Sequence, residues 1–367
     1  MDGARVTFAF FGIVYHMAWF HIAYAKDLIS IKIFDYSKIF FWITQIIPLF
    51  RMHSFFLIAG FFAAKSLMKI NFQEFLSKRV VSLHLLNIVP IVFIITSIMS
   101  YLLAFSQGEI HQLSSSYWDS LKFMYHLWFL LILFILYGAY GFLIKSNSVI
   151  TFLQKKILPI YILSLGFIYL AWAFLAKLFP IFWSLNSFII IIYSIFTYLP
   201  YFLLGAVIYH NKKIADSFMK LYLIRILISL IPIFIYMYLI SKQYGVHDGN
   251  VEPIFLVKLT LYLAKGFATF CSVYLVFLTS FHIFKNDNRL LKYLTNRSYT
   301  VYLLHLPLCW VIGYFFTKVN LDVGFKYVVS VFSVYIITLL MHDVLIRFVK
   351  PKTIQLKAPL GANTVNS

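Results

Sequence analysis

The chain consists of long apolar runs separated by short polar segments. Ten such runs, each of about twenty residues, lie at roughly 6–26, 39–63, 83–106, 122–144, 157–178, 188–209, 222–241, 256–281, 296–316 and 325–348. An α-helix of about 20 residues crosses the roughly 30 Å hydrocarbon core of a bilayer. Backbone polar groups in lipid must be hydrogen-bonded within the segment, so these runs should be helices. The pattern predicts an all-α integral membrane protein, a bundle of about ten transmembrane helices.

Composition supports the membrane assignment and argues against a nucleic-acid-binding protein or a cysteine-based metal site. Hydrophobic residues make up 62% of the chain and charged residues 12%, whereas soluble domains are about 45–50% apolar. The net charge of +19 would suit a nucleic-acid partner, but the basic residues are spread over many short loops and form no single face. Cys271 and Cys309 both fall inside apolar runs, which argues against a structural disulfide and leaves no cysteine-based metal motif. We expect no nucleic acid, no metal and no bound cofactor.

Loop charge predicts how the bundle is oriented. If the N-terminus is inside, the cytoplasmic segments carry about twice as many Lys and Arg residues as the opposite side. Positive loops favour the cytoplasm, so both termini are expected there, with an even number of spans. We predict one transmembrane domain over residues 1–350 and a polar, disordered cytoplasmic tail over 351–367. No outward loop is long enough for a separate domain, so any chemistry must take place in or at the membrane.

Ionisable side chains inside the predicted spans mark candidate functional positions. A charged group at the bilayer centre costs a few kcal/mol on insertion scales, so it usually faces the bundle interior or a wet cavity. A lone intramembrane histidine is often only a polar contact between helices. The candidates are His16, Arg51, His53, His126, His305 and His342, with Arg5 at the inner mouth of the first span.

Arg5 and His16 form the sharpest pair. They are eleven residues apart, which is about three helical turns, so they project from nearly one face. Their axial separation is about 16 Å. This spacing suits a long substrate with a phosphate group at one end and a reactive group at the other, as in an acyl-coenzyme A. Arginine can pair with phosphate, and histidine is the usual general base. Arg5 could instead serve only as a topology determinant.

Arg51 lies in the middle of the second predicted span, within the aromatic-rich segment 50–62. A guanidinium group does not deprotonate in proteins, so Arg51 needs an anionic partner or water. A structural ion pair with Asp343 is one alternative to a functional role.

Two further segments contain a histidine. His126 opens the fourth span, near the outer interface, where an aromatic belt with a capping histidine is the alternative to a functional role. In the segment 298–308, His305 lies within one turn of Pro307, which frees a backbone carbonyl. Stabilisation of a kink is the alternative interpretation there.

Taken together and in this order, these segments resemble the membrane-bound acyltransferase-3 family over essentially the whole chain. Any single motif is loose, but five in register are specific. The matching segments are Arg5 with His16 as an Arg-x10-His pair, and residues 50–62, 126–130, 198–206 and 302–307.

The resemblance implies an O-acyltransferase of the bacterial inner membrane. Its donor substrate would be a cytoplasmic acyl-CoA, either succinyl-CoA or acetyl-CoA, and its acceptor the hydroxyls of a cell-envelope glycan. Within the family, the motifs are most similar to members that succinylate periplasmic glucans. His16 would be the essential general base, and Arg5 would lie at the donor entrance. Arg51 and His126 are expected to stabilise the oxyanion or to orient the sugar.

Further residues are expected to bind substrate, and two positions depart from the family pattern. Ala59 stands where the family signature has serine, and Ser82 stands where a second arginine often follows Arg79. Part of the cationic donor surface would then be absent, or supplied by Lys78 and His84. The expected substrate-binding residues are Lys78, Arg79, His53, Trp128, Tyr302 and His305.

Several questions stay open at this level. A transporter or flippase for a sugar-lipid or organic anion also suits many spans with buried charges, although the sequence shows no paired halves. Direct transfer and a covalent acyl-enzyme are both compatible with the residues. The acyl group, the glycan acceptor and the oligomeric state are not specified.

Overall fold

The computed structural model describes residues 2–21, 38–83, 88–106, 126–144, 171, 186–220, 222–243, 255–284 and 288–348. Within these ranges the chain forms eleven α-helices, the short 3-10 helix η1 and a 3-10 turn at 126–127. In chain order the elements are α1 (Asp2–Ala18), η1 (Trp19–His21), α3 (Lys38–Leu67), α4 (Phe72–Ser82), α5 (Ile88–Ser106), α7 (Trp128–Leu143), α10 (Asn186–His210), α11 (Lys212–Met219), α12 (Leu223–Gln243), α13 (Phe255–Ile283), α14 (Arg289–Thr317) and α15 (Val323–Phe348).

The predicted fold class is confirmed: the protein is a multi-pass bundle of membrane helices. In the described part of the chain, six helices are long and apolar enough to cross a membrane, namely α3, α10, α12, α13, α14 and α15. Every predicted span overlaps a helix except 157–178, which apart from residue 171 lies outside the described residues. The tail predicted over 351–367 also lies outside them.

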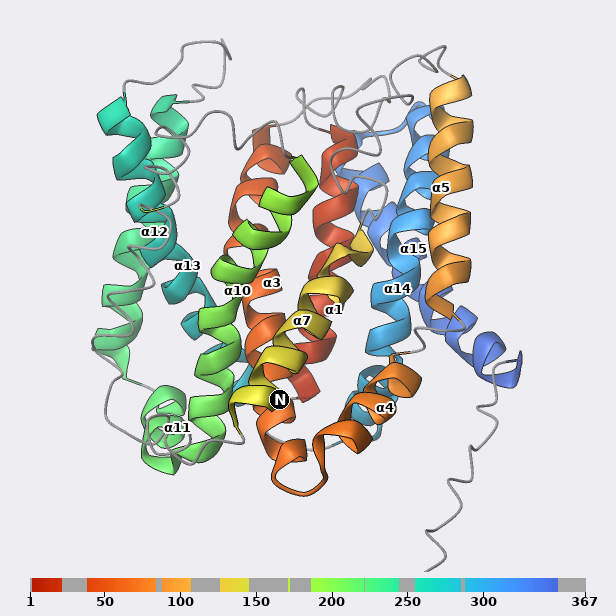
Figure 1. Cartoon of the computed structure of the whole chain (residues 1–367). Coiled ribbons are helices and arrows are strands. Elements are labelled where there is room, and N and C mark those ends of the chain that lie inside the picture. The colour runs from red at the N-terminus through yellow and green to blue at the C-terminus, as the bar shows by residue number, and fades with distance from the viewer. Residues whose placement is uncertain are drawn as a thin grey trace, which may run out of the picture.

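Two short helices, α4 and α11, were not predicted. Each is too short to span a bilayer, and each lies at the end of the bundle where the N-terminus lies (Figure 1), here called the α4 end. Asn71, Asn211 and Asn288 start α4, α11 and α14, because Oδ1 of each accepts a hydrogen bond from the backbone N–H three residues on, at 2.9, 3.1 and 2.6 Å. The same type of cap therefore starts three helices at this end.

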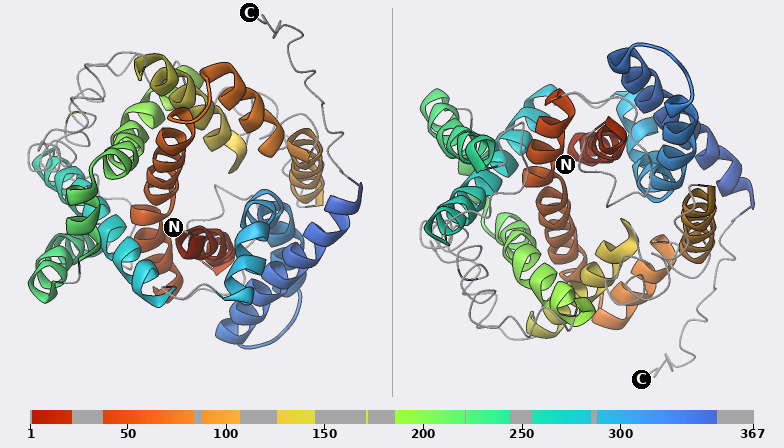
Figure 2. Two further views of the ribbon diagram at one scale, coloured as in Figure 1. Left: turned by 90° about the horizontal axis from the view of Figure 1, so that it is seen from below. Right: turned by 90° about the horizontal axis from the view of Figure 1, so that it is seen from above.

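Helix α1 lies near the centre of the bundle when it is viewed end on (Figure 2) and contacts α3, α13, α14 and α15. Helix α12 lies at the periphery and exposes large apolar side chains such as Leu223, Ile228 and Phe234. An exposed apolar face of this kind suits contact with lipid. The central position of α1 means that its side chains, including His16, face neighbouring helices.

Helices α3 and α10 approach each other closely through two glycines. A Cβ added to Gly60 would lie 1.9 Å from the carbonyl oxygen of Phe202, and one added to Gly205 would lie 1.9 Å from that of Leu57. Small residues let helix backbones approach closely in membranes. Gly60 and Gly205 both belong to matched motif segments, so these motifs serve packing as well as chemistry.

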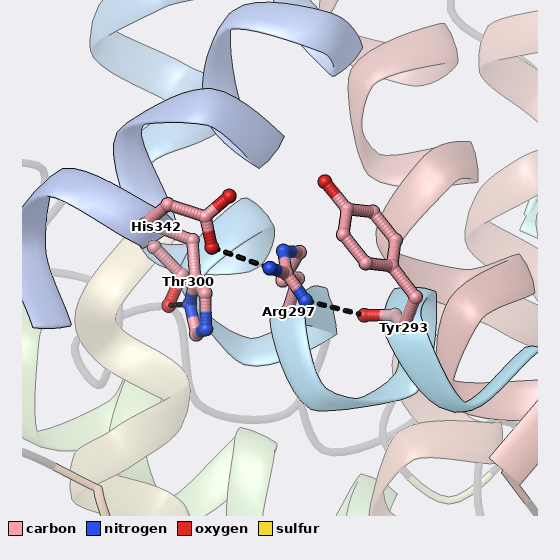
Figure 3. Close-up of polar contacts among 5 residues, drawn as sticks. Tyr293, Arg297, Thr300 and His342 are labelled. Carbon is pink, nitrogen blue, oxygen red and sulfur yellow. Dashed lines mark hydrogen bonds and ion pairs between the residues drawn. The ribbon is translucent and has the colours of Figure 1, made fainter. Parts of the chain in front are cut away.

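Helices α14 and α15 are joined by polar contacts toward the α4 end (Figure 3). Thr300 Oγ1 lies 2.7 Å from His342 Nδ1, and Arg297 forms an ion pair with Asp343. The Arg297 guanidinium also lies over the ring of Tyr293, 3.5 Å from its centroid. His342, a candidate functional histidine, is therefore a polar contact between helices.

Candidate active site

Four predicted site residues, from four different parts of the chain, meet inside the bundle. His305 on α14 is the centre of the cluster: its ring centroid lies 5.2 Å from that of His16 on α1 and 5.2 Å from that of His126, just before α7. Arg51 on α3 belongs to the same cluster, because Arg51 and His305 both lie beside Gly12 of α1. A Cβ on Gly12 would lie 3.3 Å from Arg51 Nη1 and 3.3 Å from His305 Nε2.

The cluster lies deep in the membrane part of the protein. Arg51 is about 20 Å along α3 from Lys38, and His305 is about 18 Å along α14 from Thr317. The prediction that His126 lies near the outer interface is wrong. Helix α7 has only 16 residues, so it is about 24 Å long, and it begins inside the bundle (Figure 1) with His126 buried beside α14.

A proline in α14 explains why His126 is held at this depth. Pro307 has no backbone N–H, so it cannot bond to the carbonyl of Leu303, four residues earlier. His126 Nε2 lies 2.9 Å from that carbonyl oxygen and takes the place of the missing donor. In return, the Tyr302 hydroxyl donates to the His126 carbonyl at 3.0 Å. These two hydrogen bonds fasten the start of α7 to the middle of α14.

The same carbonyl contacts select the tautomers of two histidines. His305 Nδ1 lies 2.5 Å from the carbonyl oxygen of Tyr302, and a carbonyl only accepts, so Nδ1 carries the proton. In the neutral ring Nε2 then has the lone pair. For His126 the order is reversed, because Nε2 donates to Leu303 and Nδ1 has the lone pair. Both lone-pair nitrogens are buried and have no hydrogen-bond partner among the described residues.

Arg51 does not form the ion pair with Asp343 considered above, because Asp343 pairs with Arg297 on the neighbouring helix. The Arg51 guanidinium instead lies 4.8 Å from the centroid of the Tyr15 ring on α1. Its Nη1 is buried and makes no hydrogen bond to any described residue. The positive charge of Arg51 acts on His16, His126 and His305. The site is thus cationic at its centre.

A helix N-terminus adds to this positive character. No side chain caps α7 at Leu127, and both Leu127 and Phe129 are buried. The first N–H groups of an α-helix have no intrahelical partner, and the helix dipole places partial positive charge there. Buried N–H groups at a helix start can bind an anion or an oxyanion. Here α7 begins directly after His126, and residues 126–127 form a 3-10 turn that leads into it.

The residues expected to bind donor phosphate lie at the α4 end. Arg5 is at the start of α1, with its guanidinium 4.2 Å from the centroid of the Phe62 ring. Arg79 on α4 lies over the rings of Phe75 and Tyr137, and both Arg5 and Arg79 act electrostatically on the Tyr137 hydroxyl. Lys78 points elsewhere: it is exposed and pairs with Glu74 at 2.7 Å. Both arginines are therefore within electrostatic reach of Tyr137, and Lys78 makes no described contact with either of them.

The remaining expected substrate-binding residues divide into two groups. Tyr302 belongs to the histidine cluster, with its ring centroid 5.5 Å from that of His305. His53 and Trp128 instead surround Tyr198 on α10, at centroid distances of 5.0 and 5.6 Å. His84 lies outside the described residues.

Sequence reasoning missed Gly12 and Tyr198 as parts of the site. Gly12 precedes His16 by four residues, one helical turn, so it lies on the same face of α1. That spacing could have identified it. Tyr198 lies inside a matched motif, but its position between His53 and Trp128 depends on how α10 packs against α3 and α7.

Fold and site together define a multi-pass membrane protein with a buried cluster of three imidazoles and one guanidinium group. The acyltransferase-3 family model, described as an acyltransferase domain, matches residues 1–346. The chain therefore belongs to the acyltransferase-3 family and is a membrane-bound O-acyltransferase that uses an acyl donor. Searches of curated proteins and of solved structures gave no significant match.

Proposed function

We propose that the protein transfers a succinyl or acetyl group from a cytoplasmic acyl-CoA to a hydroxyl of a cell-envelope glycan, with His16 as general base. We place it in the bacterial inner membrane, with a periplasmic glucan as the acceptor. The observation that carries the proposal is the buried Nε2 of His16, which has no hydrogen-bond partner in the described part of the chain and lies beside His305 and Arg51. The glucan is supported by the motif resemblance alone.

The donor would enter from the α4 end. Basic residues gather there on α4, α11 and the starts of α12 and α14, which is typical of a cytoplasmic side. Arg5 and Arg79 would hold the phosphates of coenzyme A through charge-assisted hydrogen bonds. Arg5 and His16 are both on α1, about 16 Å apart along its axis. A long donor bound at Arg5 would therefore present its thioester to His16.

The reaction needs one base and one site for negative charge. His16 Nε2 would take the proton of the acceptor hydroxyl while the oxygen attacks the thioester carbonyl carbon. A C–O bond forms and the C–S bond breaks, and the proton passes from His16 to the leaving thiolate. The carbonyl oxygen becomes negative in the tetrahedral intermediate. The N-terminus of α7 and the charge of Arg51 would stabilise it. A covalent acyl-enzyme on His16 would use the same groups.

The test is transfer by the purified protein in detergent or nanodiscs, with acetyl-CoA or succinyl-CoA and a glucan acceptor. Free thiol and acylated glucan are measured together. His16→Ala should lower the rate at least about 100-fold, the usual contribution of a general base. The matched control is His282→Ala on α13, because His282 Nδ1 bonds only locally, to the carbonyl of Leu278 at 2.8 Å.

Two outcomes would contradict the proposal. His16→Ala transferring as fast as wild type would exclude His16 as the base. Arg5→Gln should raise the KM for the donor with little change in kcat, and an unchanged KM would remove its phosphate-binding role.

A further inference from the structure

We infer that Arg51 Nη1 and His305 Nε2 form a recognition pair for a hydroxyl group of the acceptor, next to the hydroxyl that reacts at His16. This inference rests on the proposed function and specifies the acceptor: a sugar with two neighbouring free hydroxyls. The carrying observation is that both nitrogens lie beside Gly12, each 3.3 Å from the place that a Cβ on Gly12 would occupy, and neither has a hydrogen-bond partner among the described residues.

The chemistry of the two nitrogens is complementary. Arg51 Nη1 can only donate a hydrogen bond, because a guanidinium has no acceptor. His305 Nε2 is an acceptor, because the Tyr302 carbonyl holds the proton on Nδ1. Neither nitrogen is bonded to the other or to any other described residue. Buried polar groups are normally paired, so a donor and an acceptor that are both unpaired beside the same glycine indicate a binding position.

A hydroxyl is the functional group that satisfies both nitrogens at once. It donates its hydrogen to His305 Nε2, and its oxygen accepts from Arg51 Nη1. An ammonium group can donate to His305 but has no lone pair for Arg51. A carboxylate can accept from Arg51 but has no hydrogen for His305. The pair therefore favours polyols over amines and acids.

Gly12 and His16 make this position part of the reaction site. Gly12 lets both nitrogens approach the backbone of α1, because even a Cβ there would lie only 3.3 Å from each. His16 lies one turn further along the same face of α1. The rings of His16 and His305 are 5.2 Å apart, and both have a buried, open Nε2. One hydroxyl at each histidine requires two hydroxyls close together, as on adjacent carbons of a sugar ring.

Two substitutions at His305 distinguish a substrate-binding role of this residue from a purely structural one. The side-chain amide nitrogen of asparagine occupies the place of Nδ1, so His305→Asn keeps a donor for the Tyr302 carbonyl and loses the acceptor at Nε2. The terminal amide of glutamine reaches the place of Nε2, so His305→Gln keeps an acceptor there and loses the Nδ1 donor. A purely structural histidine would be replaced better by asparagine, and a substrate-binding one by glutamine.

The experiment measures acyl transfer to methyl β-glucoside and to its single-deoxy analogues, for wild type and both variants. For wild type, removing the hydroxyl next to the acylated one should lower kcat/KM for the acceptor about 10- to 100-fold, as expected for a hydrogen bond to a charged group. His305→Asn should lower kcat/KM for the intact sugar by a similar factor and be insensitive to that deoxy position. His305→Gln should recover part of the rate, and the KM for acyl-CoA should not change.

Equal use of intact and deoxy sugars by wild type would overturn the inference while leaving acyl transfer in place. So would full activity of His305→Asn with loss in His305→Gln. Failure of wild type to acylate any sugar, with every thioester tested, is a different pattern and would overturn the proposed function together with the inference.

Discussion

The contact between His126 and the carbonyl of Leu303 should exist only because residue 307 is a proline. His126→Phe keeps a ring and removes the donor that lies 2.9 Å from this buried oxygen. Side-chain hydrogen bonds in membrane proteins average about 0.6 kcal/mol, with a maximum near 1.7, and an orphaned buried acceptor costs about 1–3 kcal/mol. We therefore expect His126→Phe to lower the free energy of unfolding by about 1–2 kcal/mol.

In a Pro307→Ala background the cost should nearly vanish. Alanine restores a backbone N–H that can bond to Leu303, so the carbonyl no longer depends on His126. The double-mutant cycle should give a coupling of about 1 kcal/mol between positions 126 and 307. Unfolding of the purified proteins by SDS in mixed micelles, followed by circular dichroism, measures all four free energies.

Tyr302→Phe is the matched control, because it removes the reciprocal bond to the His126 carbonyl and leaves the Leu303 carbonyl untouched. Its cost should be the same with proline or alanine at position 307. An equal cost of His126→Phe in both backgrounds would refute the argument that the proline created the acceptor.

Two further predictions concern packing and polar contacts. Gly60→Ala should abolish folded protein, because its Cβ would lie 1.9 Å from a backbone carbonyl oxygen. Gly12→Ala meets only side-chain tips at 3.3 Å, so the protein should fold but have a raised KM for the acceptor. Size-exclusion profiles and kinetics distinguish the two variants, and equal folding of both would contradict the glycine contact between α3 and α10. Arg297→Gln should cost no more than about 1 kcal/mol in stability, since its partner Asp343 is 43% exposed, and should leave kcat unchanged; a large loss of kcat would place this pair in the catalytic site.

Hydropathy predicted the long helices well, because burial in lipid requires about 20 apolar residues in a row. It failed where helices are short or start within an apolar run. Helix α4 contains charged residues around the buried Phe75, so hydropathy does not predict it. The apolar run 122–144 has no break at the start of α7, so the depth of His126 was not visible in it.

The ion-pair partner of Asp343 also could not be predicted from the sequence. The sequence suggested Arg51 as a partner for Asp343, and spacing along the chain does not indicate Arg297. The packing of α14 against α15 decides the pairing, because it brings Arg297 to Asp343. Arg51 lies on α3, which packs against α10, α13 and α1.

The sequence by itself determined the class of protein, the long helices, the common face of Arg5 and His16 on α1, and the motifs that indicate acyl transfer. These features depend on local periodicity and composition, which a chain carries without reference to its fold. Only the tertiary structure decided that His16, Arg51, His126 and His305 share one site. It also decided that the carbonyl freed by Pro307 is bonded by a histidine from a distant segment. Such contacts depend on how helices pack, and helix packing is set by many side chains at once rather than by any one run of residues.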